Sequence, residues 1–231
     1  KTTTLYAALR ELDRTDDHIV SMEEPVEHRF PNITQIELGG AAKIEYSNLL
    51  RSVVRQDPDV LACGEIRDEE TLSVTIQSAL SGVLTLACMH ADDAPAAPVR
   101  MLDMGCPPYV LATSLTLVVA QRLVRRLCPE CKQAGQLSAE EAAVLPLDEG
   151  SPVYRPGWCE ECDRTGYYDR VGVFELMPVT GELRDLIMRE ARADELREAA
   201  WTDDTHPLLQ SGARYVQEGV TSPQEVIRVL R

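Results

Sequence analysis

The sequence predicts an α/β fold in which helices cover both faces of a parallel sheet. Short apolar runs, typical of buried strands, alternate with amphipathic helical segments through residue 126. Three of the predicted strands are followed by ionisable side chains, which are Glu23, Glu65 and His90. The carboxyl ends of parallel strands meet at one edge of a sheet, where such folds bind ligands, so these side chains are expected to share a site.

The clearest strand lies in residues 55–68, with the sequence RQDPDVLACGEIRD. Residues 60–63 are continuously apolar, turn-forming residues precede them, and Gly64 ends the run. Glu65 follows directly, where a carboxylate can hold Mg²⁺ or order a water for attack on a phosphate. An exposed acidic turn is the alternative interpretation of this segment alone, and the other strand ends favour a site.

The chain begins with a predicted helix whose apolar positions recur at helical spacing from residue 5 to residue 12. Lys1-Thr2 matches the last two positions of the phosphate-binding motif G-x-x-x-x-G-K-[ST]. In that motif Lys contacts the β- and γ-phosphates and the Thr hydroxyl ligates Mg²⁺. Two matching positions are also compatible with an ordinary helix start.

The next predicted strand, residues 18–22, ends in an acidic stretch with carboxylates at Glu23, Glu24 and Glu27. Carboxylates at neighbouring strand ends can divide metal binding and water activation between them. A solvated turn fixed by Pro25 is the alternative, and which carboxylate is the base stays open.

The remaining elements follow the same patterns. Residues 33–38 and 83–89 read as strands, and residues 47–56 and 70–81 as helices. An apolar helix is predicted from Tyr109 to Ala120, closed by arginines, and it is too short to span a membrane. Helices are also predicted over 181–200, with a break near Ala191, and over 207–218. A capping box at Ser222 and Glu225 opens a last helix that runs to residue 230.

Two C-x-x-C pairs are separated by 27 residues that offer little core of their own. Four thiolates in two such pairs suit tetrahedral Zn²⁺ in a closed, structural site. Disulfides or free thiols are the alternatives, and the absence of an apolar leader segment at the start favours the metal. The predicted ligands are Cys128, Cys131, Cys159 and Cys162.

The net charge of −15 argues against a duplex-DNA binder, which needs a basic face, so no nucleic-acid partner is expected. A nucleotide site is compatible with this charge, because it needs only one or two cations and backbone N–H groups.

Taken in order, the motifs resemble the secretion and pilus ATPases, a family that includes the type II secretion motor and the type IV pilus assembly ATPases. KTTTLYAAL resembles the end of the Walker A loop, IVSMEEPVE the acidic "Asp box", RQDPDVLACGEIRD the Walker B segment and LTLACMHADDA the "His box". The two cysteine pairs resemble the family's tetracysteine block. The resemblance covers nearly the whole chain and implies a RecA-like P-loop NTPase core with a tetracysteine zinc subdomain and C-terminal helices.

By position, the resemblance implies that Lys1, Thr2 and Thr3 bind ATP and Mg²⁺. Glu23 would be the general base, Glu65 would polarise water or order the metal, and His90 would sense the γ-phosphate. The implied domains are the ATPase core at 1–126, the tetracysteine subdomain at 127–176 and a helical subdomain at 177–231.

The function implied is an ATP-hydrolysing homohexameric motor for type II secretion. It would be cytoplasmic and peripheral at the bacterial inner membrane, bound through platform proteins. These residues alone are expected to hydrolyse little ATP, because most of the phosphate-binding motif precedes Lys1. Alternatives are a pilus assembly ATPase, a catalytically inactive zinc-stabilised ring component and a pilus retraction ATPase, the last disfavoured by the tetracysteine block.

Overall fold

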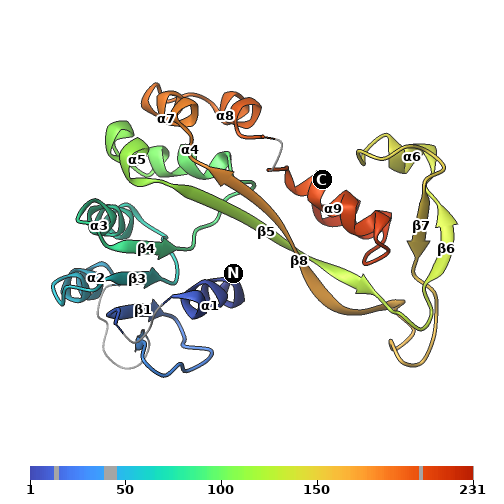
Figure 1. The fold of residues 1–231 in the computed structure, drawn as a ribbon, viewed down its shortest axis with the longest axis horizontal. Helices are drawn as coiled ribbons and strands as arrows, with labels where there is room; N and C mark the ends of the chain where they lie inside the picture. Colours follow the sequence, from blue (N-terminus) through green and yellow to red (C-terminus); the bar gives the residue numbers. More distant parts are fainter. Residues whose placement is uncertain (13–15, 39–45, 203–204, 231) are drawn as a thin grey trace. The chain divides into compact units, whose positions relative to one another are not determined.

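The computed structural model describes residues 1–12, 16–38, 46–202 and 205–230, which form two compact units (Figure 1). Unit 1 comprises Lys1–Thr116 and Val179–Ala199, and unit 2 comprises Leu117–Pro178 and Ala200–Arg231. The chain thus returns to unit 1 after the cysteine pairs, whereas the sequence suggests three consecutive segments. Those three segments stay a prediction about subdomains.

Unit 1 is built on a four-stranded parallel sheet in the order β2-β1-β3-β4, which confirms the α/β prediction. Its strands are β1 (Ile19–Glu23), β2 (Thr34–Glu37), β3 (Val60–Cys63) and β4 (Leu84–Ala87).

Helices cover both faces of this sheet (Figure 1), which agrees with the burial of every residue of β1 and β3. On one face Leu5, Tyr6 and Leu9 of α1 (Thr2–Glu11) pack against β1 and β3. On the other face α2 (Tyr46–Val54) and α3 (Glu69–Leu80) pack against Val20, Met22 and Leu61.

The rest of unit 1 is helical, and the break predicted near Ala191 is confirmed. The helices are α4 (Ala96–Asp103), α5 (Pro108–Ser114), α7 (Gly181–Met188) and α8 (Ala193–Ala199). Asp93 accepts a hydrogen bond from the first backbone N–H of α4 and pairs at 2.7 Å with Arg197 of α8, so one carboxylate fastens both elements.

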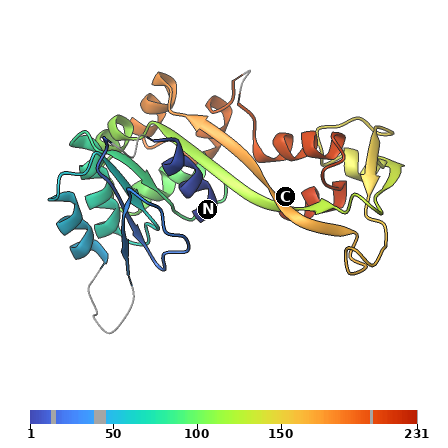
Figure 2. The same cartoon turned by 60° about the horizontal axis from the view of Figure 1, so that its bottom comes forward.

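The helix predicted from Tyr109 to Ala120 is wrong in its second half. Helix α5 ends at Ser114, and β5 (Leu117–Leu127) then pairs antiparallel with β8 (Tyr167–Pro178) along almost its whole length (Figure 2). The β-branched residues Val118, Val119 and Val124 suit a strand. A partner some 50 residues later, which periodicity cannot register, decides the conformation.

The described part of unit 2 adds a small hairpin and three helices to this ribbon. The hairpin strands are β6 (Gln133–Gln136) and β7 (Pro152–Arg155), and the helices are α6 (Ala139–Ala142), α9 (Leu208–Gln217) and α10 (Pro223–Leu230). Leu137, Leu145 and Val153, which lie between the cysteine pairs, pack against Val216 of α9 and Val226 of α10. The segment between the pairs therefore borrows its core from the C-terminal helices.

The capping box predicted at the start of α10 is only half formed. The Ser222 hydroxyl accepts the backbone N–H of Glu225, as expected. The Glu225 side chain is fully buried and accepts instead from the Arg125 backbone and from the guanidinium groups of Arg125 and Arg228. Burial acts to raise the pKa of Glu225, but these hydrogen bonds outweigh it and lower the pKa to about 2. The carboxylate thus fastens α10 to β5.

Within the described part of the chain, no helix is long and apolar enough to cross a membrane.

Candidate functional site

The exits of β1, β3 and β4 lie side by side, because these strands are neighbours in a parallel sheet. Gly64 allows the close approach. Its N–H donates to the Met22 carbonyl at 2.8 Å, and a Cβ there would lie 2.8 Å from that carbonyl oxygen. Glu65 therefore leaves β3 directly beside the end of β1.

Glu65, His90 and Lys1, three residues that the sequence singles out separately, form one chain of contacts. His90 Nε2 lies 2.8 Å from Glu65 Oε1, and His90 Nδ1 lies 3.3 Å from Lys1 Nζ. Lys1 Nζ also donates to the Met89 carbonyl at 2.7 Å. Since an ammonium can only donate, His90 accepts at Nδ1 and carries its proton on Nε2, where it donates to Glu65.

Arg67 is a site residue that sequence reasoning missed. Its Nε donates to Glu65 at 2.6 Å and its Nη1 to Glu24 at 3.1 Å, so it bridges the carboxylates at the ends of two strands. Burial acts to raise the pKa of Glu65, but the hydrogen bond and charge of Arg67, together with His90, outweigh it and hold that pKa below its ordinary value. Glu65 is therefore an ionised acceptor. The only signal in the sequence was the spacing of Arg67, two residues after Glu65.

Glu23, the predicted base, is buried at the end of β1 with 3% of its surface exposed. It accepts hydrogen bonds from Ser21 Oγ at 2.7 Å, Gln35 Nε2 at 3.0 Å and the hydroxyl of Tyr6. Glu24, by contrast, is exposed. Sequence reasoning missed both Tyr6 and Gln35 as partners of Glu23, because no spacing rule connects them.

A cavity of about 420 Å³ joins these groups at the N-terminus of α1. The backbone N–H groups and the dipole at the start of a helix favour an anion. Lys1 and Arg67 add positive charge, and Thr2 contributes a hydroxyl, whereas Thr3 is exposed and is not among the described residues that border the cavity. Carboxylates and a hydroxyl are oxygen ligands that suit Mg²⁺. The cavity is lined, among others, by Lys1, Thr2, Glu23, Glu24, Glu27, Glu65, Arg67 and His90.

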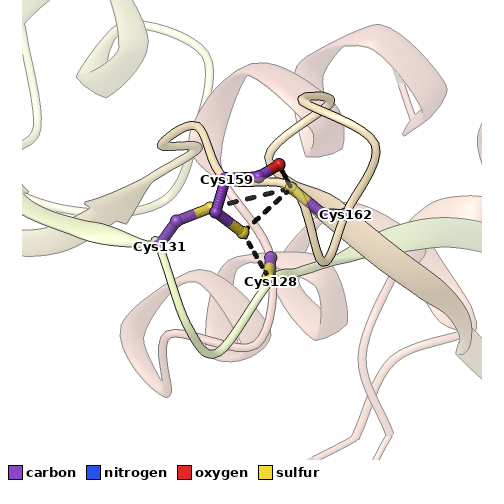
Figure 3. Close-up of side chains that lie close together, drawn as sticks. All are labelled: Cys128, Cys131, Cys159 and Cys162. Atoms are coloured by element: carbon purple, nitrogen blue, oxygen red, sulfur yellow. Dashed lines mark hydrogen bonds between the residues drawn. The ribbon is translucent and has the colours of Figure 1, made fainter.

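The four predicted cysteines of unit 2 converge, and their sulfur atoms all lie within 4.8 Å of one another (Figure 3). The S···S distances are 3.8 Å for Cys128–Cys159, 3.8 Å for Cys131–Cys162 and 3.5 Å for Cys159–Cys162. Thiolates about 2.3 Å from a tetrahedral Zn²⁺ are about 3.8 Å apart. These spacings fit a metal, and all four thiols are free.

The backbone around the cysteines is packed closely enough to fix their positions. A Cβ on Gly157 would lie 1.7 Å from the Cys131 carbonyl oxygen, so only glycine fits there. The Gly166 N–H donates to Cys162 Sγ at 3.2 Å, the kind of outer hydrogen bond that orients a metal ligand. The donor set fits Zn²⁺ in a closed, structural site.

Comparison with known proteins places the chain among secretion and pilus proteins. Residues 1–228 match the family model described as type II/IV secretion system protein. The chain is 40% identical over 231 residues to the type II secretion system protein HxcR of Pseudomonas aeruginosa, covering 100% of the chain and 46% of HxcR. It is 37% identical over 234 residues to the type IV pilus assembly ATPase TfpB of Acinetobacter baylyi, covering 100% of the chain and 40% of TfpB.

The fold is similar to that of a solved pilus retraction motor, PilT with bound ADP. The TM-score is 0.72 at 21% identity, and the match covers 99% of this chain and 57% of that one. At this identity the similarity concerns the fold alone. The chain spans less than half the length of the two curated relatives above.

Proposed function

The chain belongs to the type II/IV secretion system protein family, and from this premise we propose that it is the ATP-hydrolysing part of a motor that powers type II protein secretion. One observation carries the proposal. Lys1, Glu65 and His90 border a single cavity at the N-terminus of α1. One site there can bind the phosphates, hold the metal and activate the water.

Within this site each group has a proposed role. Lys1 and the first N–H groups of α1 bind the phosphates of ATP, and Thr2 with Glu65 provides oxygen ligands for Mg²⁺. When bound, Mg²⁺ neutralises charge that develops on the phosphate oxygens. His90 contacts both Lys1 and Glu65, so it can transmit the binding of the γ-phosphate to Glu65.

The general base is proposed to be Glu23, which is one of the residues lining the cavity and lies at the end of β1. Glu24 is engaged by Arg67 and Glu27 is exposed, so neither is held in place as firmly as Glu23.

A type IV pilus assembly ATPase is the second candidate, favoured by the similarity to TfpB. Identities of 40% and 37% to a secretion protein and a pilus ATPase are too close to separate the two. A catalytically inactive ring component is disfavoured because the cavity brings together Lys1, Glu65 and His90. A retraction motor is disfavoured by the cluster of four cysteines, because the retraction-type members of the family lack the tetracysteine block.

Replacing Lys1 by Ala is expected to weaken ATP binding by about 10–100-fold, the loss of a hydrogen-bonded charge facing phosphate. The measurement is titration of the full-length protein that contains this chain with a fluorescent ATP analogue. Lys132→Ala, in unit 2, removes an equal charge and should bind as the wild type does. Equal affinity of the Lys1 variant and the wild type would refute a nucleotide site here.

The full-length protein is also expected to form a closed homohexameric ring, peripheral at the inner membrane through platform proteins. This expectation rests on the family, which includes motor ATPases. Light scattering with and without a non-hydrolysable ATP analogue tests it, and the ring should be most populated with the analogue. A monomer with full ATPase activity under every nucleotide condition would exclude the ring.

A further inference from the structure

Among the described residues, the hydrogen bonds to Glu23 leave one acceptor position unused, and it lies on the oxygen that Tyr6 binds. Oε1 accepts from both Ser21 and Gln35, and Oε2 accepts from Tyr6. An ionised carboxylate offers about four acceptor positions, two on each oxygen. The position left for an incoming water is therefore the second one on Oε2.

The hydroxyl of Tyr6 can donate in only one direction. Its oxygen accepts the backbone N–H groups of Glu27 at 3.1 Å and His28 at 3.4 Å, so its proton is left for Glu23. Burial and the hydrogen bond to Glu23 raise the pKa of Tyr6 above its ordinary value, so the hydroxyl stays protonated.

Gln35 of β2 makes a similar set of contacts, and it binds the other carboxylate oxygen of Glu23. Its amide donates to Glu23 at 3.0 Å and to the His28 carbonyl at 2.9 Å, and its oxygen accepts the Phe30 N–H at 2.7 Å. Tyr6 and Gln35 therefore each contact both Glu23 and the backbone of the segment after it. These contacts fix the position of Glu23 relative to the segment that carries Glu24 and Glu27.

We propose that Tyr6 is a positioning residue for Glu23, which it holds in register with the phosphate-binding end of α1. Tyr6 lies about one turn after Thr2 on that helix. Because Tyr6 belongs to α1, its hydrogen bond couples Glu23 to the start of that helix. The unused acceptor position on Oε2 thereby keeps its place relative to phosphates bound at the helix start. The inference rests on the proposed ATPase function and adds a residue that is not among the described residues lining the cavity.

The step that Tyr6 supports is ordinary hydrolysis. A water bound at Glu23 Oε2 forms a bond to the γ-phosphorus, the bond between that phosphorus and the ADP oxygen breaks, and Glu23 takes the water proton. Tyr6 keeps its own proton throughout. Because attack needs close alignment, a small loss of order at Oε2 lowers the rate without changing nucleotide affinity.

Tyr6→Phe tests the proposal in the full-length protein. The ring keeps its packing, including the edge-to-face contact with Phe30, whose ring centroid lies 4.9 Å from that of Tyr6. Only the hydroxyl is lost. We expect kcat to fall about tenfold or more, as for loss of a hydrogen bond to a charged group, while KM and ATP affinity stay within about twofold. Tyr167→Phe is the matched control, because its hydroxyl hydrogen-bonds Ser222 within unit 2 and Tyr167 is not among the described residues that line the cavity, so kcat should stay near wild type.

A double-mutant cycle with Glu23→Gln shows whether Tyr6 acts through Glu23. In that background Tyr6→Phe should cause no further loss of kcat, because the positioned group is already disabled. Independent, multiplying losses would overturn the proposal, as would wild-type kcat in Tyr6→Phe. Should Tyr6→Phe prove unstable, Gln35→Met removes the opposite donor and should show the same split between kcat and KM.

The cycle also separates this proposal from the proposed function. A wild-type protein that hydrolyses no ATP defeats the ATPase assignment itself. Full turnover in Glu23→Gln, with loss in Glu65→Gln, leaves the ATPase standing but removes the role of Glu23 and with it that of Tyr6.

Discussion

Replacing Glu65 by Gln is expected to lower steady-state phosphate release by the full-length protein by about 10²-fold or more. Glu65 is ionised, 25% exposed at its side chain and paired with both Arg67 and His90. The amide keeps the size of the side chain but cannot neutralise a metal or polarise water. Nucleotide affinity should stay close to wild type, because Lys1 and the N-terminus of α1 are unchanged.

The control for this experiment is Glu69→Gln, the same chemical change in the first turn of α3 at an exposed position outside the cavity. It should retain wild-type turnover. Phosphate release is measured beside ATP affinity for each variant. A Glu65 variant with near-wild-type turnover would contradict the assignment of this cavity as the catalytic site.

Zinc removal is expected to give the second large effect. Purified full-length protein should hold one Zn²⁺ per chain at the four cysteines, and a strong chelator should unfold unit 2 at temperatures where the metal-bound protein is stable. The hairpin of β6 and β7 carries little core of its own, so the metal supplies much of its folding free energy. Structural zinc sites bind with apparent free energies of about 10–16 kcal/mol in small peptides.

The variants for this test are Cys131→Ser, which removes a ligand, and Cys106→Ser, which changes a buried thiol of unit 1 outside the cluster. Elemental analysis should show metal loss only in the first, and thermal unfolding should show a lower midpoint only there. A metal-free wild type of unchanged stability would rule out the zinc site.

The candidate site at the edge of the sheet could be predicted from sequence because its signals are local. An apolar run of four residues, a turn before it and a glycine after it identify β3, and Glu65 follows in the chain itself. Parallel topology makes the carboxyl ends of β1, β3 and β4 neighbours. The proximity of His90 and Glu65 could therefore be predicted from the sequence, and the structure places them 2.8 Å apart. The cysteine cluster was predictable in the same way, since the spacing of C-x-x-C pairs is a chain property.

The tertiary structure alone decided the rest. Residues 117–127 form a strand because β8 supplies the hydrogen bonds, and a partner so distant in sequence leaves no trace in local periodicity. The contacts of Tyr6 and Gln35 with Glu23, and of Arg67 with Glu24, join elements that no spacing rule relates. They depend on how α1 packs on the sheet and on the register of β2 beside β1, which many weak side-chain contacts fix together rather than any single motif.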